Sequence, residues 1–303
     1  LDDLVHTLAV ASGRYSVADI VHKAERRSQP RKPLPTVEAA VLNNELILVA
    51  EDNEINSEVI REQLRILGYV SEAAEDGLVA LKMWRTGRYS LLFTDCHMPD
   101  LDGFELAEAI RKEEPQGSRF PIIAVTANVM QGEAQRCLSS GMNDYLSKPL
   151  RLGDLGAKLA RWLPQKRAAV QAKAESANEA QNVSAEIPAV ADIVWDNTAL
   201  TRMVGDNPEM HRRLLDKFLQ GAAEQVVGIV GAASAGDLAS IASVAHKMKS
   251  AARTVGAMRL GSLCQSLEIA ARAADSNASL TLAAGLQATF QEAEAQIKSA
   301  CGK

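Results

Sequence analysis

The chain has 303 residues, a formal net charge of -5 and an aromatic content of only 4%. This length favours two compact domains with linkers, and the low aromatic content suits helix-rich packing better than a β-sandwich. The negative charge gives no reason to expect nucleic acid as a partner. Four scattered cysteines without a CxxC pair predict neither a disulfide framework nor a zinc site, and they fit a reducing cytoplasm.

Membrane contact by this chain itself is not expected. No apolar run approaches the ~20 residues that a membrane-spanning helix needs, and the first residues lack a signal-peptide pattern. Because the sequence begins at Leu1 rather than at Met, we interpret it as a fragment, and any membrane anchor would lie outside it.

Residues 1–45 are interpreted as a linker, since residues 15–42 contain three prolines and several basic side chains. A second interpretation is that Leu1–Ala9 is the tail of a preceding α/β module, because it can be aligned with Leu152–Ala160. Chance similarity between two leucine-rich helices explains the alignment equally well.

Residues 46–164 alternate short apolar runs with amphipathic stretches, which predicts five βα units. Strands this apolar are buried on both faces, so we expect a doubly wound parallel sheet with helices on either side. The expected strands are Ile47–Ala50, Val70–Ala73, Leu91–Thr94, Ile122–Thr126 and Asp144–Leu146.

Residues 165–191 consist largely of Ala, Gln, Lys, Glu and Ser without apolar periodicity, and we interpret them as a linker. If flexible, this linker spans about 30 Å; if partly helical, it is stiffer.

Residues 192–303 show helical periodicity only, which predicts an all-α antiparallel four-helix bundle. Asn207 and Pro208 are a suitable N-cap and first helical position, and Gly256 is expected to end the second helix. The third helix is expected around residues 260–271, and the last over residues 282–300.

Charged side chains follow the predicted strands at one edge of the sheet, where ligands bind in parallel α/β folds. Glu51, Asp52 and Asp95 would repel one another unless a cation lies between them, and Mg²⁺ is the hard cation that such oxygen ligands prefer. The same ion would neutralise a phosphoryl group arriving on Asp95, with Lys148 as a second positive charge and the Thr126 hydroxyl as a donor.

These residues and their spacing make residues 46–164 similar to the receiver domain of response regulators and hybrid sensor kinases. The resemblance implies that Asp95 is the phosphoacceptor. It further implies an acidic pair that holds Mg²⁺ (Glu51, Asp52), a main-chain carbonyl ligand (His97), switch positions (Thr126, Tyr145) and a lysine before proline (Lys148). Glu51 replaces an aspartate, which is tolerated if that position acts through water. Tyr145 is also compatible with simple packing, and Cys96 with a small buried filler.

A second reactive candidate, His246, lies about 130° from the apolar stripe of its helix, so we expect its ring to face solvent. Lys249 and Ser250 lie one turn on, and Arg253 nearly overlies His246 two turns away. The nearby positive charge would stabilise a phosphorylated imidazole without adding an acid that competes for the proton. His6, His22 and His211 have no such context and are expected at the surface.

Residues 192–303 resemble the histidine-containing phosphotransfer (HPt) domain, whose AHxLKG motif matches Ala245–Ser250. Gly256, Ala257, Leu260 and the stretch from Cys264 to Glu268 extend the match, whereas Met248 and Ser250 replace the usual leucine and glycine. The resemblance implies that His246 is a phosphoacceptor and Lys249 its catalytic neighbour.

Together the two regions resemble the C-terminal part of a hybrid sensor histidine kinase. This implies a phosphotransferase in which Asp95 receives phosphate from an upstream histidine kinase domain, of the same protein or a dimer partner, and His246 passes it to a downstream response regulator. The sequence shows no glycine-rich ATP-binding region, so the chain is not expected to phosphorylate itself from ATP. A regulatory receiver that restrains a kinase core, or a phosphate sink, remains an alternative. The expected location is cytoplasmic, including the cytosolic part of a membrane-anchored sensor kinase.

Overall fold

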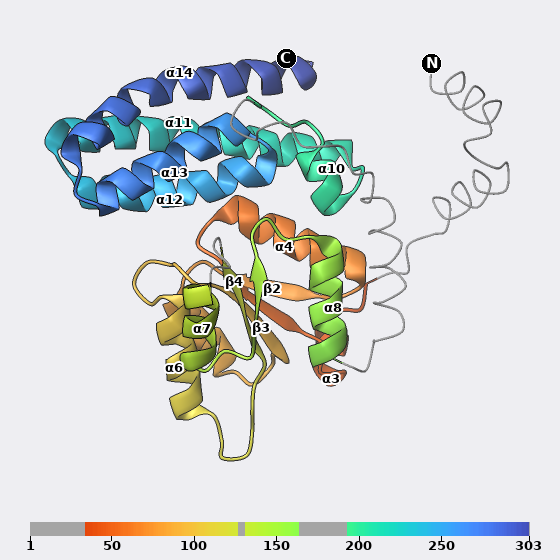
Figure 1. Ribbon diagram of the computed structural model, residues 1–303. Coiled ribbons are helices and arrows are strands. Elements are labelled where there is room, and N and C mark those ends of the chain that lie inside the picture. Colours follow the sequence, from red (N-terminus) through yellow and green to blue (C-terminus); the bar gives the residue numbers. More distant parts are fainter. Residues whose placement is uncertain (1–33, 127–130, 164–192, 303) are drawn as a thin grey trace, which may run out of the picture. The chain divides into compact units, whose positions relative to one another are not determined.

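The computed structural model describes residues 34–126, 131–163 and 193–302 (Figure 1). A parallel sheet with flanking helices is followed along the chain by a helical bundle, which confirms the predicted fold class. The segment Leu1–Ala9 and the predicted linker 165–191 lie outside the described residues. None of the described helices is both long and apolar enough to cross a membrane.

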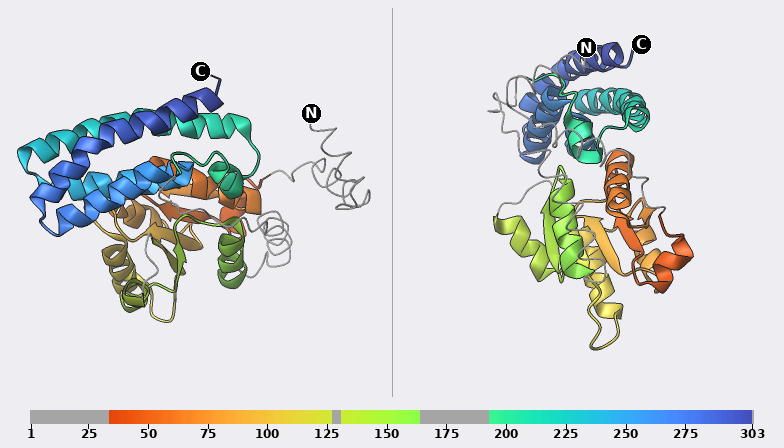
Figure 2. Two further views of the ribbon diagram at one scale, coloured as in Figure 1. Left: turned by 45° about the horizontal axis from the view of Figure 1, so that its top comes forward. Right: turned by 90° about the vertical axis from the view of Figure 1, so that its right-hand side faces the viewer.

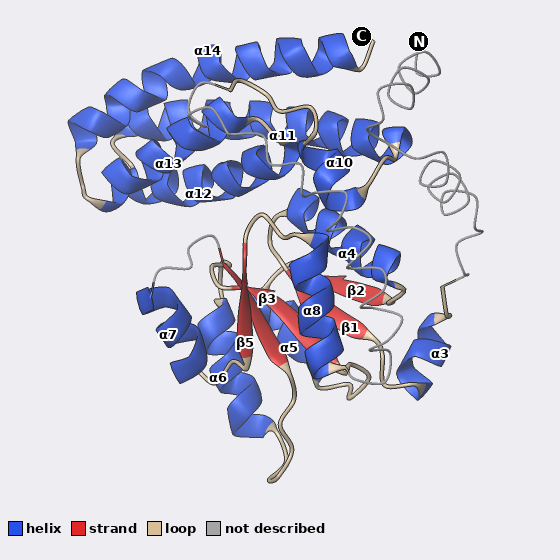
Figure 3. Ribbon diagram, turned by 45° about the vertical axis from the view of Figure 1, so that its right-hand side comes forward, coloured by secondary structure: helices blue, strands red, loops and turns tan. Residues whose placement is uncertain are grey.

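The sheet has the strand order β2-β1-β3-β4-β5, and every neighbouring pair is parallel (Figure 3). Its strands are β1 (Ile47–Ala50), β2 (Ser71–Ala74), β3 (Leu91–Asp95), β4 (Ile122–Thr126) and β5 (Asp144–Ser147). Since β1 lies beside β3 and Ala50 is in register with Thr94, the acidic residues that follow or end these two strands meet at one edge.

Alternate residues of the central strands enter two separate cores, as the period-two geometry of a strand requires. Ile47, Val49 and Phe93 pack against α4 (Glu54–Leu67) and α8 (Leu152–Trp162). Leu48 and Leu92 face the opposite core, which α5 (Gly77–Trp84), α6 (Gly103–Glu113) and α7 (Gln131–Ser139) cover (Figures 1 and 2).

Two local expectations were wrong. The edge strand β2 has the sequence SEAA, and only Ala74 is buried, because an edge strand needs no apolar side chain on its open side. Within the expected linker 1–45, residues Val37–Leu42 form helix α3, which Thr36 caps. Ala40 of α3 is fully buried in the core beside α5 and α6, and this burial stabilises a helix too short to persist alone.

The C-terminal region is a bundle of four long helices preceded by a short one, α10 (Ala199–Val204), that the periodicity did not predict. The long helices are α11 (Pro208–Ala235), α12 (Leu238–Val255), α13 (Met258–Arg272) and α14 (Ser276–Ala300). Asn207 caps α11 as predicted. Gly256 ends α12 with a φ of 87°, and a Cβ there would come within 2.2 Å of the Asp196 carbonyl oxygen.

Helix α4 belongs to the receiver-like part but also packs on the bundle, and residues 35–303 form one compact unit (Figure 2). Ile55 and Val59 are buried in the same apolar cluster as the bundle residues. Gln63 of α4 donates to the carbonyl oxygens of Leu150, at 2.9 Å, and of Met203 in α10, at 3.1 Å. One helix thus serves two domains.

Candidate functional site

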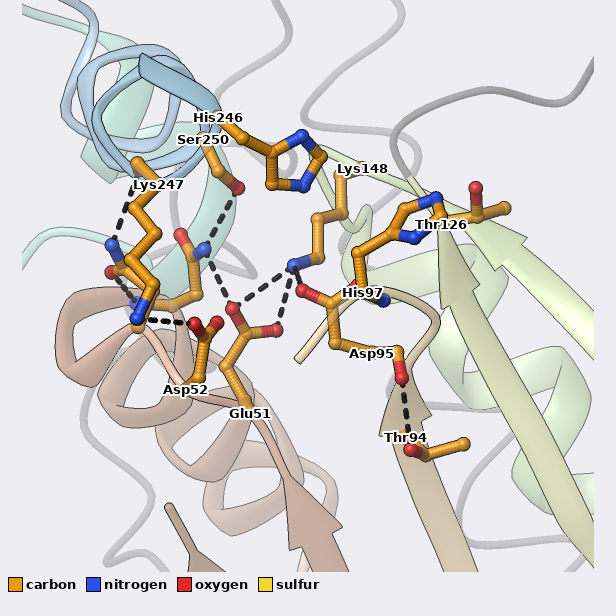
Figure 4. A network of polar contacts seen from close by, with 12 residues as sticks. Glu51, Asp52, Thr94, Asp95, His97, Thr126, Lys148, His246, Lys247 and Ser250 are labelled. Carbon is orange, nitrogen blue, oxygen red and sulfur yellow. Dashed lines mark hydrogen bonds and ion pairs between the residues drawn. The ribbon is translucent and has the colours of Figure 1, made fainter. Parts of the chain in front are cut away.

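Three carboxylates meet at the carboxyl ends of β1 and β3 (Figure 4). Glu51, Asp52 and Asp95 each place an oxygen within 4.8 Å of the others. Glu51 and Asp95 are only 2% and 5% exposed. Buried like charges at this spacing require compensating cations, and a set of hard carboxylate oxygens fits Mg²⁺. The sequence predicted this grouping because parallel strands end at a common edge.

Lys148, which follows β5, supplies one of these cations. Its Nζ lies 2.6 Å from Asp95 Oδ2 and 2.7 Å from Glu51 Oε2. Burial lowers the pKa of Lys148, but the charges of Asp95 and Glu51 outweigh burial and raise it above its usual range. For Glu51 the effect of burial has the opposite direction, because burial disfavours its negative charge and raises its pKa. The charge of Lys148 lowers this pKa, and the charge of Asp95 raises it further. Lys148 is therefore a permanent positive charge beside the Asp95 carboxylate.

The remaining predicted residues lie around Asp95. His97, whose carbonyl is the expected ligand, donates its main-chain N–H to Asp95 Oδ1 at 3.3 Å. Thr126, at the end of β4, donates its hydroxyl to Glu133 Oε1 of α7 at 2.5 Å, a partner that the sequence did not predict. Tyr145 is half-buried against the core under α5 to α7, so its side chain is neither fully packed away nor free.

His246, on α12, has an acidic partner, which corrects the expectation that no acid lies beside it. Its Nδ1 is 2.8 Å from Glu268 Oε1 on α13, and Lys249 Nζ is 2.6 Å from Glu268 Oε2. Arg272 also contacts Glu268 Oε1, at 2.9 Å. Because a carboxylate only accepts, Nδ1 carries the proton and Nε2 keeps a lone pair for attack. Burial raises the pKa of Glu268, but hydrogen bonds from His246 and Lys249 outweigh it and lower this pKa to about 2.

The sequence named Glu268 only as part of a family match. Glu268 lies 22 positions from His246 along the chain, so no helical spacing links the two residues. Packing of α12 against α13 brings them together. Lys249 could be recognised from the motif, but no sequence pattern indicated that its ammonium group would bind Glu268.

The His246 ring points out of its bundle, as the helix face predicted, but it does not face open solvent. Its side chain is only 15% exposed. The ring centroid lies 5.4 Å from that of His97, in an edge-to-face arrangement. Burial lowers the pKa of His97. The expectation of a solvent-facing ring was therefore wrong, because the sheet domain covers it.

Polar contacts from both domains surround this junction (Figure 4). Lys247 Nζ lies 2.8 Å from Asp52 Oδ2, and Asn53 donates its side-chain amide to the Lys247 carbonyl at 3.3 Å. Asn56 donates to Ser250 Oγ and accepts from Thr254 Oγ1, both at 2.8 Å. The same Asn56 amide donates to Glu51 Oε1 at 2.9 Å. One amide thus links the acidic cluster to the helix that carries His246.

Comparison with known families gives two matches. The response regulator receiver domain matches residues 47–160, and the Hpt domain matches residues 213–296.

The chain is also similar to curated hybrid kinases. It is 28% identical to the sensor histidine kinase GacS of Pseudomonas protegens over 88% of this chain and 28% of that protein. It is 36% identical to the sensor histidine kinase RcsC of Escherichia coli over 49% of this chain and 16% of that protein. It is 45% identical to the hybrid signal transduction protein dokA of Dictyostelium discoideum over 39% of this chain and 7% of that protein. The chain therefore spans less than a third of the length of these relatives.

Among solved structures, the receiver domain of the sensor histidine kinase PA1611 of Pseudomonas aeruginosa, with a magnesium ion in its active-site cleft, is 43% identical. The match covers 40% of this chain and 99% of the PA1611 receiver chain, with a TM-score of 0.38. The complex of Ypd1 with the Ssk1 receiver domain of Saccharomyces cerevisiae is 32% identical over 39% of this chain and 87% of the matched chain, with a TM-score of 0.36. By these family matches, residues 47–160 belong to the response regulator receiver domains and residues 213–296 to the Hpt domains, and the similar curated proteins include sensor histidine kinases.

Proposed function

We propose that the chain relays phosphate in three transfers. Asp95 accepts a phosphoryl group from the histidine of an upstream kinase domain, in the same protein or in a dimer partner. His246 takes it from Asp95, and a downstream response regulator receiver takes it from His246. The observation that carries this proposal is the His246 ring in contact with His97, two residues beyond Asp95.

In the first transfer, an Asp95 oxygen attacks phosphorus, the N–P bond of the donor histidine breaks, and its electron pair returns to the imidazole. Lys148 at 2.6 Å from Asp95 offsets charge on the phosphoryl oxygens. The acidic cluster and the His97 carbonyl would hold Mg²⁺, which neutralises negative charge at the incoming phosphoryl group.

In the second transfer, the Nε2 lone pair of His246 attacks phosphorus, the acyl O–P bond breaks, and the Asp95 carboxylate leaves with the electron pair. The imidazole then carries a positive charge, and Glu268 at Nδ1 stabilises it. Lys249 stays paired with Glu268 and keeps that carboxylate in place. Because donor and acceptor share one chain, their effective concentration is about millimolar.

We place this relay in the cytoplasm. All four cysteines are free thiols, and the sulfurs of Cys96 and Cys137 share a hydrogen bond at 3.7 Å without forming a disulfide. Reduced cysteines of this kind suit a reducing compartment.

A small acyl phosphate donor with Mg²⁺ tests the order of transfer. We expect base-labile phosphate on Asp95 and acid-labile phosphate on His246 in the wild type. Asp95→Asn should lose both, whereas His246→Gln should keep the phosphate on Asp95. Persistent phosphorylation of His246 in Asp95→Asn would contradict the proposed order.

A further inference from the structure

Lys247 of the HPt domain places a cation on the acidic cluster of the receiver domain. Its Nζ lies 2.8 Å from Asp52 Oδ2, and the Asp52 side chain is only 7% exposed. The Asn53 amide holds the Lys247 carbonyl at 3.3 Å, so the backbone of this lysine is fixed as well as its ammonium group. The Lys247 side chain is 34% exposed, so the pair is partly buried and salt screens it less than a fully exposed pair.

Asp52 is also one of the three carboxylates that would hold Mg²⁺. An ammonium group on one oxygen of a carboxylate repels a divalent cation bound at the other. It also spreads the charge of that carboxylate over two partners. Lys148 already contacts the other two carboxylates of the cluster. Lys247 is therefore a second lysine at the cluster, and it is present only while the HPt domain is docked.

We infer that Lys247 makes docking of the HPt domain and Mg²⁺ binding by the receiver domain oppose each other. Docking weakens Mg²⁺ affinity through the Lys247–Asp52 pair, and Mg²⁺ weakens docking by the same factor, since such coupling is reciprocal. The inference rests on the proposed Mg²⁺ site, but not on the order of phosphate transfer.

Because of this coupling, the receiver site has two states. When the HPt domain is released, the acidic cluster binds Mg²⁺ tightly and is open to an upstream donor. When the HPt domain is docked, Lys247 replaces part of the positive charge and His246 is in place. Lys247, which stands at the unspecified position of the AHxLKG motif, would thus set the balance between loading of the receiver site and relay to His246.

Calorimetric titration of the full chain with Mg²⁺ tests this directly. We expect Lys247→Gln to bind Mg²⁺ about tenfold more tightly than the wild type, from the repulsion between a divalent and a monovalent cation a few ångströms apart. Lys298→Gln is the matched control, because it removes the same charge from an exposed pair with Glu294 on α14 and should leave the affinity unchanged.

A second background separates docking from a purely local effect. Val59→Asp places an unpaired carboxylate among the bundle side chains that cover this 3% exposed residue and should release the HPt domain. In this background the affinity for Mg²⁺ should already be high, and Lys247→Gln should add nothing. Equal affinities of wild type and Lys247→Gln, or equal tightening in both backgrounds, would overturn the coupling.

Hydrogen exchange of the α4 amides gives the reciprocal readout. Mg²⁺ should increase exchange over Glu54–Leu67 in the wild type and have a smaller effect in Lys247→Gln. If no variant bound Mg²⁺ saturably, including the released one, the metal site itself would be wrong. Intact binding without a Lys247 effect would refute only the coupling.

Discussion

At the scale of single residues, Glu268 shows how one carboxylate can serve a reactive site from a neighbouring helix. It binds Nδ1 of His246 and the ammonium group of Lys249 at once. The two contacts fix the imidazole tautomer and give a buried lysine a carboxylate partner. A solvated histidine on the same helix would have neither a fixed tautomer nor a counter-ion for its cationic product.

Glu268 also makes stability depend on pH. Its pKa falls from an ordinary 4.5 to about 2 on folding, so between these values the unfolded chain binds more protons. Its stabilising contribution is therefore complete above about pH 4.5 and is lost as the pH falls toward 2. We expect Glu268→Gln to be less stable than the wild type at pH 7, and this deficit to shrink below pH 4.5. Urea unfolding across this range measures it.

Glu292→Gln serves as the control, because Glu292 is an exposed residue paired with Arg259. The free energy of unfolding of Glu292→Gln should equal that of the wild type at every pH. If the free energy of unfolding of Glu268→Gln stayed below that of the wild type by the same amount down to pH 2, the partners of Glu268 would not lower its pKa.

Gly103 is needed for space rather than for backbone freedom. A Cβ at this first residue of α6 would lie 2.1 Å from the Asp95 carbonyl oxygen. We expect Gly103→Ala to lower the free energy of unfolding by about 1–3 kcal/mol and to slow phosphorylation of Asp95, because the end of β3 must move. Thermal unfolding and the rate of acyl phosphate labelling measure the two effects.

Gly132→Ala is the matched helical substitution, since nothing lies within 4 Å of a Cβ at Gly132 in α7. It should be neutral or stabilising. Similar behaviour of the two variants would mean that α6 can shift away from Asp95 at little cost.

At the scale of elements, α4 explains how one helix can hold two domains together. One side of it, with Ile60 and Leu64, packs on the sheet, and another, with Ile55 and Val59, lies in the core of the bundle. The first turn of α4 follows Glu51 and Asp52 directly. Docking of the bundle on α4 therefore also sets the position of α12 over Asp95. The contact that brings His246 to the receiver domain is therefore apolar at its centre and polar at its edge.

Val59→Asp should separate docking from phosphorylation. Val59 is 3% exposed in the docked chain, and a carboxylate there would lie unpaired among bundle side chains. We expect Asp95 to be labelled at the normal rate while transfer to His246 falls at least tenfold, as quench-flow would show. Arg61→Asp, on the exposed side of α4, should leave both rates unchanged. Unimpaired transfer in Val59→Asp would mean that relay does not use this face.

At the scale of the whole molecule, the internal receiver domain occupies the face of the HPt domain that carries His246, and the proposed relay needs the same face for a downstream receiver. His246 is 15% exposed in this arrangement, so delivery in the proposed relay would require release of the internal domain. Weak, reversible contacts suit such exchange better than a large apolar interface. The exposed ion pairs between α4 and α11 are of this kind.

Charge exchange across this interface tests the role of these pairs. Arg213→Glu with Lys217→Glu should slow transfer from Asp95 to His246 about threefold to tenfold, because exposed pairs each contribute little. Adding Glu54→Lys and Glu58→Lys should restore the rate by re-forming the pairs in reverse. Failure of this rescue would mean that the charges act elsewhere than across the interface.

The sequence determined most of the fold and the composition of the acidic site. Apolar runs, a helical period and the turn signals at Asn207 and Gly256 are local, so they predicted the strands and the bundle helices directly. Parallel strands end at one edge, and this rule alone predicted that Glu51, Asp52, Asp95 and Lys148 meet. Helix α3 was not predicted, because its stability comes from burying Ala40 in the domain core.

Tertiary structure decided which partners those residues have. Glu268 at His246, Lys247 at Asp52 and Glu133 at Thr126 are contacts between separate elements, and no sequence period relates them. The coverage of the His246 ring likewise depends on how α4 packs against the bundle. Local patterns specify elements and the residues they carry, whereas side-chain contacts depend on how the finished elements pack together.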